Sequence, residues 1–250
     1  MRRLRQLMSP IAILLIWEAC SRWGLVDRLL LPPPSQIFID IGQLLVSGEL
    51  LQALWASSRR ILIGFSIAVV FSVPIGALMA RSSLIEDLLH PLVELIRPIS
   101  PLAIYPLALL WFGLGDGSKI FLIALSCSFP IVLNTYAGVK SIDVALVRAS
   151  MSLGATPVEI FRRIILPGSL PHIFTGVRIA WGIALIVIIA TEMVGAIAGI
   201  GHMILDAQQT FEVARVYSGI FVIGALGFLT DFGFRALRRR IMPWYKELSS

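Results

Sequence analysis

Long apolar runs follow one another along the chain, and polar residues are confined to the short segments between them. A transmembrane helix needs about 20 mostly apolar residues, because the hydrocarbon core of a bilayer is about 30 Å thick. Six runs meet or approach this length: residues 6–21, 61–80, 99–115, 120–139, 179–201 and 216–230. The pattern therefore predicts an all-α membrane protein, a polytopic bundle of about six transmembrane helices.

The composition supports this class. The chain is 57% hydrophobic and 14% charged, whereas soluble domains carry about 25% charged residues. Its mean hydropathy is +0.88. We expect a single transmembrane domain over residues 1–250, with a first span at 6–24, a peripheral external segment at 25–58 and a core at 59–236.

The charged residues predict how the chain crosses the membrane. The net charge is +6, and the clustering of its basic residues favours a topological signal over nucleic-acid binding. With a cytoplasmic amino terminus, the inner segments hold Arg2, Arg3, Arg5, Arg81, Lys140, Arg148, Arg162, Arg163, Arg235, Arg238, Arg239, Arg240 and Lys246. The outer segments hold Arg28, Arg59, Arg60, Lys119 and Arg215. This bias places both termini and the loop 140–178 in the cytoplasm.

Two features of the external segment carry local predictions. Arg59 and Arg60 oppose the charge bias, and we expect them at the outer interface on a surface helix over about 48–60. The prolines at 32–34 predict a rigid extended turn, after which Ser35 caps a helix whose apolar residues recur at helical spacing.

The loop 140–178 is too polar to cross a membrane. Gly154 is expected to end a first short helix, since glycine readily adopts the left-handed conformation. Thr156, Pro157 and Glu159 then match a capping box, which begins a second helix that Pro167 is expected to end. The two short helices suit docking to a soluble partner. The alternative is an amphipathic linker that rests on lipid headgroups.

The spacing within this loop resembles a family motif. Arg148-Ala149-Ser150, Gly154, Ile164 and Leu166-Pro167 fit EAA-x3-G-x9-I-x-LP, the cytoplasmic loop of the permeases of ATP-binding-cassette (ABC) importers. Of the first three letters only Ala149 is kept, and Arg148 stands where glutamate is usual. This chain therefore has no carboxylate at that position of the motif.

The resemblance covers nearly the whole chain and points to the nitrate/sulfonate/taurine branch, most of all to taurine and aliphatic-sulfonate permeases. The segments that carry it are residues 58–60, 74–76, 97–98, 111–115, 138–140, 168–171, 191–192, 199–201 and 239–244. It implies the type I importer permease fold in the cytoplasmic (inner) membrane. It also implies import of taurine or an aliphatic sulfonate, with nitrate, bicarbonate or a thiamine-precursor-like solute as alternatives.

The resemblance further implies partners. They are a second copy of the permease, two cytoplasmic ABC ATPases and an extracytoplasmic substrate-binding protein. ATP hydrolysis on the separate ATPase chains would drive transport, so the chain itself is expected to be neither an enzyme nor a cofactor-binding protein. The expected ATPase-coupling residues are Arg148, Ala149, Ser150, Gly154, Ala155, Thr156, Pro157, Glu159, Ile160, Phe161, Arg162, Ile164, Leu166 and Pro167.

Polar residues inside the apolar runs are candidates for the solute pathway. A carboxylate at the bilayer centre costs about 2.5–3.5 kcal/mol on insertion scales, so Glu192 should face the bundle or a cavity, as a gate or as a structural group. Ser100, Tyr105, Ser128 and Asn134 offer hydrogen bonds to an oxyanion or, alternatively, between packed helices. Glu94 and Arg97 are spaced to pair on one helix face.

Other classes of protein fit less well. Residues 113–119 lack the Lys-Ser/Thr order of a phosphate-binding loop and are interpreted as a tight outer turn. The three histidines are scattered, which disfavours a metal site or an intramembrane hydrolase. An ion-coupled carrier would show paired intramembrane charges or inverted repeats, and neither is visible. Cys20 and Cys127 lie in apolar runs and are expected to be unpaired.

Overall fold

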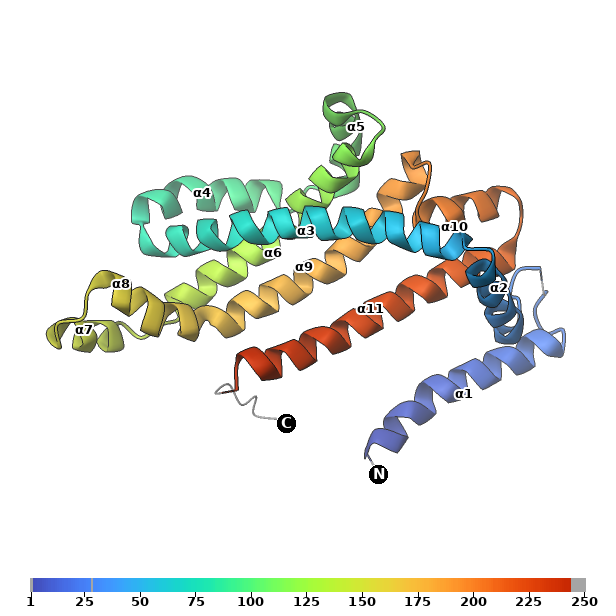
Figure 1. Cartoon of the computed structure of the whole chain (residues 1–250), viewed down its shortest axis with the longest axis horizontal. Coiled ribbons are helices and arrows are strands. Elements are labelled where there is room, and N and C mark those ends of the chain that lie inside the picture. Colours follow the sequence, from blue (N-terminus) through green and yellow to red (C-terminus); the bar gives the residue numbers. More distant parts are fainter. Residues whose placement is uncertain (1, 28, 244–250) are drawn as a thin grey trace. The chain divides into compact units, whose positions relative to one another are not determined.

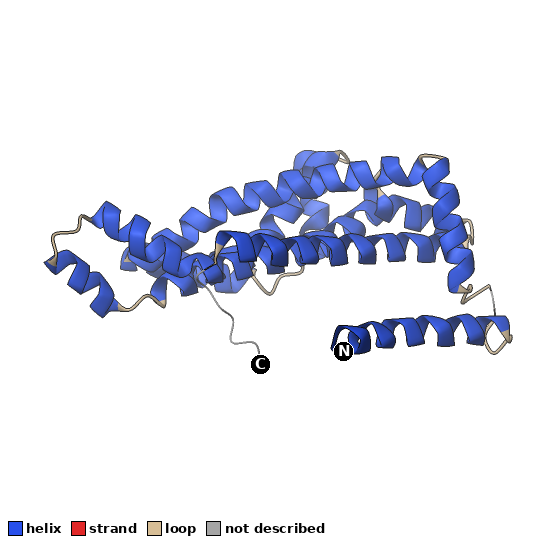
Figure 2. Cartoon of the chain, turned by 60° about the horizontal axis from the view of Figure 1, so that its bottom comes forward, coloured by secondary structure: helices blue, strands red, loops and turns tan. Residues whose placement is uncertain are grey.

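The structure is a computed structural model that describes residues 2–27 and 29–243 (Figure 1). Arg28, Trp244 and Lys246, which contributed to the predicted charge bias and family motifs, lie outside the described residues. In chain order the helices are α1 (Arg2–Arg22), α2 (Pro34–Val46), α3 (Glu49–Arg81), α4 (Ser83–Ile96), α5 (Pro101–Phe112), α6 (Asp116–Lys140), α7 (Val144–Ser152), α8 (Pro157–Ile160), the π-helical turn η1 (Phe161–Ile165), α9 (Leu166–Gly195), α10 (Ile200–Gln209) and α11 (Val213–Ile241). Short loops join them, and the described part of the chain has no strand (Figure 2). The predicted all-α class is confirmed.

The helices form two compact units. The first comprises Met1–Ser58 and Glu192–Leu226, and the second comprises Arg59–Thr191 and Gly227–Ser250. The long helices α3, α9 and α11 each contribute residues to both units.

The first unit is held together around the start of α11. Trp17 of α1 packs edge-on against Tyr217, with ring centroids 5.5 Å apart. The Ser218 hydroxyl donates to the Ile37 carbonyl of α2 at 3.3 Å. Gly219 lies directly against Ile204 of α10, where a Cβ would overlap the isoleucine side chain.

Close helix contacts build the second unit. A Cβ on Gly76 of α3 would lie 2.6 Å from the Val132 carbonyl of α6, and one on Gly176 of α9 would lie 2.7 Å from the Asn134 Cβ. Small residues permit such approach, which is the usual packing device of membrane helices. α6 therefore lies against both α3 and α9. Its buried core side chains include Leu122, Ile123, Cys127 and Ile131.

The predicted number of spans is not confirmed. In the described residues, α3, α6, the helical stretch Pro157–Gly195 and α11 are long and apolar enough to cross a membrane. A fifth span is reached only if α4 and α5, bent by 101°, act as one. The predicted span 99–115 contains the 12-residue α5, which rises only about 18 Å, well short of the hydrocarbon core. The predicted first span falls in α1, which is not among these helices.

The external segment differs from two predictions. Residues 49–60 are the first part of α3 and not a separate surface helix, because no glycine or proline interrupts the chain before Gly64. α2 begins at Pro34 after Pro33, and Ser35 does not cap it. The Ser35 backbone N–H and hydroxyl instead donate to the Glu18 carboxylate of α1, at 3.0 and 2.8 Å. A negative group at a helix N-terminus is favourable.

Candidate functional site

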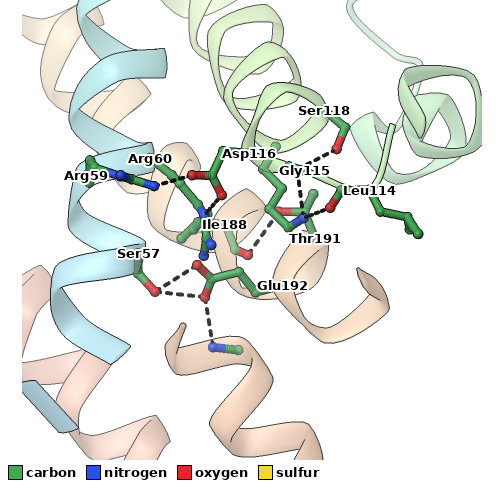
Figure 3. Close-up of polar contacts among 12 residues, drawn as sticks. Ser57, Arg59, Arg60, Leu114, Gly115, Asp116, Ser118, Ile188, Thr191 and Glu192 are labelled. Atoms are coloured by element: carbon green, nitrogen blue, oxygen red, sulfur yellow. Dashed lines mark hydrogen bonds and ion pairs between the residues drawn. The ribbon is translucent and has the colours of Figure 1, made fainter. Parts of the chain in front are cut away.

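Glu192 lies in the last turn of α9, and its side chain is fully buried in the first unit. The Ser57 hydroxyl of α3 lies 2.9 and 2.8 Å from the two carboxylate oxygens, and the Gly201 backbone N–H donates to the carboxylate at 3.0 Å (Figure 3). Ser57 in turn accepts a hydrogen bond from the Ile200 N–H at 3.0 Å. A buried carboxylate needs such donors, because an unsatisfied charge is costly to bury. Glu192 thus connects α3, the end of α9 and the start of α10.

Gly199 closes this site. Its φ of +137° is one that side-chain-bearing residues rarely adopt, and a Cβ there would overlap the Glu192 carboxylate. The span predicted at 179–201 is therefore interrupted, since α9 ends at Gly195 and α10 begins at Ile200.

The two basic residues that oppose the predicted charge bias, Arg59 and Arg60, form ion pairs in the second unit. Arg60 Nε lies 2.6 Å from Asp116 Oδ1, and Arg59 pairs with the other carboxylate oxygen (Figure 3). Asp116 is the first residue of α6, where a negative charge also favours the helix dipole. The Arg60 side chain is only 8% exposed, so this pair is a partly buried anchor between α3 and α6.

The segment before α6 is a tight turn, as predicted. Gly113 has a φ of +73°, and the buried Lys119 ammonium donates to the carbonyls of Leu114 and Gly115, both at 3.1 Å (Figure 3). The lysine therefore holds the turn from within and presents no cradle for a phosphate.

The predicted cytoplasmic loop has its predicted local geometry. α7 ends before Gly154, whose φ is +85°. The capping box is present, with Thr156 Oγ1 accepting from the Glu159 N–H at 3.3 Å and the Thr156 N–H donating to Glu159 at 2.9 Å. The hydrogen bond from the Thr156 N–H lowers the pKa of Glu159, with a smaller effect from Arg163. Two short helices thus meet at a left-handed glycine.

Pro167 does not end the second helix. α8 passes into the π-helical turn η1, which holds Phe161, Arg162 and Ile164, and then into α9 at Leu166. Pro167 lies in the first turn of α9, where its missing N–H is tolerated after the wider π turn. The loop is therefore continuous with the long helix that follows it.

The remaining surface of this loop offers apolar groups to a partner. Leu153 is 88% exposed and Val158 is 66% exposed. Arg148 and Ala149 are exposed on α7, while Ile160 is buried. A groove of about 450 Å³ is lined by Ser150, Leu153, Gly154, Ala155, Glu159, Ile160, Arg163 and Ile164.

Among the candidate pathway residues, Asn134 lines a cavity together with other polar groups. This cavity, of about 360 Å³, is lined by Arg97, Ile99, Pro101, Ser126, Phe129, Pro130, Leu133, Asn134 and Ile183. Tyr105 instead donates to the Thr191 carbonyl at 3.1 Å, and Ser128 donates to the Ala124 carbonyl at 2.7 Å. Ser100 is exposed in the bend before α5.

The predicted Glu94–Arg97 pair is present beside this cavity, at 3.4 Å. Both side chains are largely exposed, so the pair adds little stability. From the sequence, Arg97 is expected to pair with Glu94 on one helix face. Spacing along one helix does not bring Arg97 together with Ser126, because Arg97 follows α4 and Ser126 lies on α6.

Neither unit offers a metal centre in its described residues: no group of three or more His, Cys, Asp or Glu side chains has a suitable arrangement. Cys20 and Cys127 are free, as predicted.

Comparison with known proteins identifies the family. The chain is 38% identical to the taurine transport system permease protein TauC of Escherichia coli K12, over 96% of this chain and 90% of that protein. It is 34% identical to the putative aliphatic sulfonates transport permease protein SsuC of Bacillus subtilis 168, over 96% and 87%. Its fold matches a chain of the inward-facing MetNI methionine ABC transporter with a TM-score of 0.68, at 18% identity, over 77% of this chain and 95% of that one.

The family assignment rests on the larger part of the chain. Residues 72–243, which contain the capping-box loop, α9 and Glu192, match the family described as the inner membrane component of binding-protein-dependent transport systems. The resemblance inferred from the EAA-like spacing is confirmed, and so is the type I importer permease fold. The chain belongs to this family of ABC-importer permeases, multi-pass inner membrane proteins that act as transport subunits and are not themselves enzymes.

Proposed function

We propose that this permease forms the translocation path for a small sulfonate, with taurine as the first candidate. The observation that carries the proposal is the 38% identity to a taurine permease along nearly the whole of both chains. The aliphatic-sulfonate permease at 34% identity supports the same solute class. Solutes of this class combine a permanently anionic sulfonate with a short body that is apolar or carries an ammonium group.

The cavity around Asn134 suits such a solute. It places the Arg97 guanidinium and the polar side chains of Ser126 and Asn134 among apolar walls that include Phe129 and Leu133. A few polar groups in a mainly apolar pocket are typical of small-molecule sites. We propose that Arg97 and Asn134 contact the sulfonate oxygens during passage, since arginine suits oxyanion recognition. Glu192 is more than 90% buried and hydrogen-bonded, which favours a positioning role over contact with an anion.

The loop is proposed to dock a cytoplasmic ATPase. The exposed Leu153 and Val158 flank the Gly154 turn, and the adjoining groove contains both apolar and basic groups. We propose that the loop 140–178 and both termini face the cytoplasm, in agreement with the distribution of Lys and Arg.

The working assembly is proposed to contain two permease copies, two ATPases and an extracytoplasmic binding protein. One permease carries one such loop, whereas a pair of ATPases presents two docking sites, so a two-fold arrangement matches them. The mass of the detergent-purified complex should equal two permeases and two ATPases. A single-permease complex that still transports would contradict this assembly.

Uptake measurements test the solute. The permease, its co-purified ATPase and the binding protein are rebuilt in proteoliposomes, and ATP-dependent uptake is measured for labelled taurine, an alkanesulfonate, nitrate and bicarbonate. We expect taurine and the alkanesulfonate to enter and to compete with each other. ATP-dependent uptake of nitrate or bicarbonate without sulfonate uptake would replace the proposed solute class.

Two variants test the cavity in the same assay. Arg97→Gln removes the positive charge and should lower sulfonate uptake about tenfold or more, because a hydrogen bond to a charged group contributes about 1.5–3 kcal/mol. Glu94→Gln is the matched control, since it breaks the same surface pair without removing the cation. Equal uptake by both variants and the wild type would place the solute elsewhere.

A further inference from the structure

A basic cavity lies between α9 and the last part of α11, within the second unit. It has a volume of about 340 Å³ and is lined by Phe174, Thr175, Arg178, Ile179, Gly182, Asp231, Arg235 and Arg238. The lining therefore contains three arginines and one aspartate. None of these residues belongs to the coupling loop motif or to the Asn134 cavity.

One carboxylate orients two of the guanidinium groups. Arg178 Nε donates to Asp231 Oδ1 at 2.6 Å, and Arg235 Nη2 lies 2.9 Å from Asp231 Oδ2. Asp231 offsets one of these positive charges, so the lining side chains carry more positive than negative charge. The Arg178 and Arg235 side chains remain 44% and 48% exposed. Each guanidinium has five N–H donors, so both arginines have donors left for an anion after binding Asp231.

Aromatic side chains adjoin the charged groups. Phe174 packs edge-on against Phe234 with centroids 5.8 Å apart, and Trp181 packs against the same ring at 5.9 Å. The Trp181 indole N–H donates to Thr230 at 2.8 Å. Tryptophan with one polar hydrogen bond and an apolar body is typical of the boundary between membrane and water. On α11 itself, Phe228 and Phe232 are 67% and 63% exposed.

The position along the helices sets the depth of the cavity. α11 is apolar enough to span a membrane, and its last turn carries Arg238, Arg239 and Arg240. Arginines at the end of a span lie at headgroup level. An anionic phospholipid at that depth would have its phosphate among the arginines and its acyl chains beside the exposed aromatic side chains.

We propose that this cavity binds the phosphate of an anionic phospholipid and that the lipid bridges α9 and α11. Arg178 and Arg235, held by Asp231, and Arg238 contact the phosphate, while the acyl chains lie along α11 beside Phe228 and Phe232. This lipid site is separate from the solute path and does not depend on which solute is transported.

Native mass spectrometry of the full permease, purified from bilayers of phosphatidylcholine with phosphatidylglycerol, measures the lipid directly. We expect phosphatidylglycerol, and not phosphatidylcholine, to stay bound to the wild type. Arg178→Gln combined with Arg235→Gln and Arg238→Gln should lower retention about tenfold or more, since each surface arginine attracts anionic lipid appreciably. Arg239→Gln combined with Arg240→Gln is the control: it removes neighbouring charges outside the cavity and should retain the lipid.

A steric variant keeps the test decisive if the charge variant folds poorly. A Cβ added at Gly182 meets no atom within 4 Å, so Gly182→Leu should be accepted by the helix while its side chain fills the cavity. We expect this variant to lose phosphatidylglycerol with every arginine present. Because a ligand that binds only the folded state raises its stability, the lipid should also raise the melting temperature of the wild type and not that of Gly182→Leu.

A measurement with inorganic phosphate distinguishes a lipid phosphate from a free phosphate ion as the anion that the cavity binds. If millimolar phosphate alone gives the full melting-temperature rise, the cavity is a free-anion site and the lipid proposal is wrong. The proposal is also overturned if the cavity variants retain lipid as the wild type does, or if the Arg239/Arg240 control loses it equally. Sulfonate uptake plays no part in these measurements, so a failed solute assignment would leave their outcome unchanged.

Discussion

Ser57 and Glu192 are 135 positions apart in the sequence, and the Ser57 hydroxyl lies 2.9 and 2.8 Å from the two carboxylate oxygens of Glu192. The same hydroxyl accepts the Ile200 N–H, while the carboxylate accepts the Gly201 N–H. The first turn of α10 is therefore attached to α3 and α9 through two side chains. This connection explains how a charged residue is retained inside an apolar segment.

Glu192 should act through its shape and hydrogen bonds. Glu192→Gln keeps the side-chain volume and a carbonyl acceptor, so we expect much of the transport to remain. Glu192→Ala leaves the Gly201 N–H and the Ser57 hydroxyl without their acceptor and opens a void, at a cost of about 1–3 kcal/mol for each unpaired group. Uptake of labelled solute per inserted permease checks this.

Two outcomes would contradict that role for Glu192. Full activity in both variants would make the residue dispensable. Complete loss in both would show that the negative charge itself is required.

Gly199 should resist even the smallest substitution. Gly199→Ala places a Cβ against the Glu192 carboxylate and forces alanine into an unfavourable backbone conformation at φ +137°, which costs about 1–3 kcal/mol before any clash. We expect a clear fall in the melting temperature of the purified permease. Gly224→Ala, in the same unit and with open space around its Cβ, is the control and should be nearly neutral. Equal melting temperatures would refute the tight fit.

Gly154 should matter for its backbone conformation alone. A Cβ there meets no neighbouring atom, but φ is +85°. Gly154→Val should therefore distort the α7–α8 turn and abolish co-purification of the ATPase, while the permease still inserts. Gly154→Asn is the matched control, because asparagine tolerates the left-handed region. Stoichiometric ATPase with Gly154→Val would argue against this loop as the docking site.

Arg59 and Arg60 should differ in their effect although both pair with Asp116. Arg60 is 8% exposed and Arg59 is 52% exposed. We expect Arg60→Ala to destabilise the permease by about 1.5–3 kcal/mol through the lost charged hydrogen bond, and Arg59→Ala by about 0–1 kcal/mol. Thermal unfolding in one detergent compares them. A larger effect for Arg59 would show that burial does not rank these two contacts.

The capping box should depend on pH in a defined direction. Hydrogen bonding from Thr156 holds the pKa of Glu159 below its ordinary value of 4.5. A lowered folded-state pKa means that the stabilisation is present above 4.5 and is lost as the pH falls through the lowered value. Amide-exchange protection of α8, corrected for the intrinsic rate, should therefore drop at acidic pH. Glu159→Gln should remove this pH dependence, whereas Thr156→Ala should lower protection by about 0.5–2 kcal/mol at neutral pH.

The sequence by itself determined the helical membrane class, the family and the local geometry of the loop at the Gly154 turn and the capping box. These depend on residues close together in the chain. Apolar runs of spanning length form α3, α6 and most of α9, and the Thr156–Glu159 capping box needs only backbone and side-chain atoms three residues apart. Gly154 adopts its left-handed turn for the same local reason.

Only the tertiary structure decided which polar groups meet. Arg60 pairs with Asp116, which lies 56 positions further along the chain, and this ion pair anchors α3 to α6. The Glu18 carboxylate of α1, 17 positions before Ser35, accepts a hydrogen bond from the Ser35 hydroxyl at the start of α2. Ser35 therefore binds α1 and does not cap its own helix. The run predicted as the span 99–115 forms the short α5, which is bent by 101° from α4. A hydropathy pattern records how much apolar surface a segment can bury but not which distant donor or acceptor it will meet, because a buried charge is stabilised only by the partner that packing brings within hydrogen-bond distance.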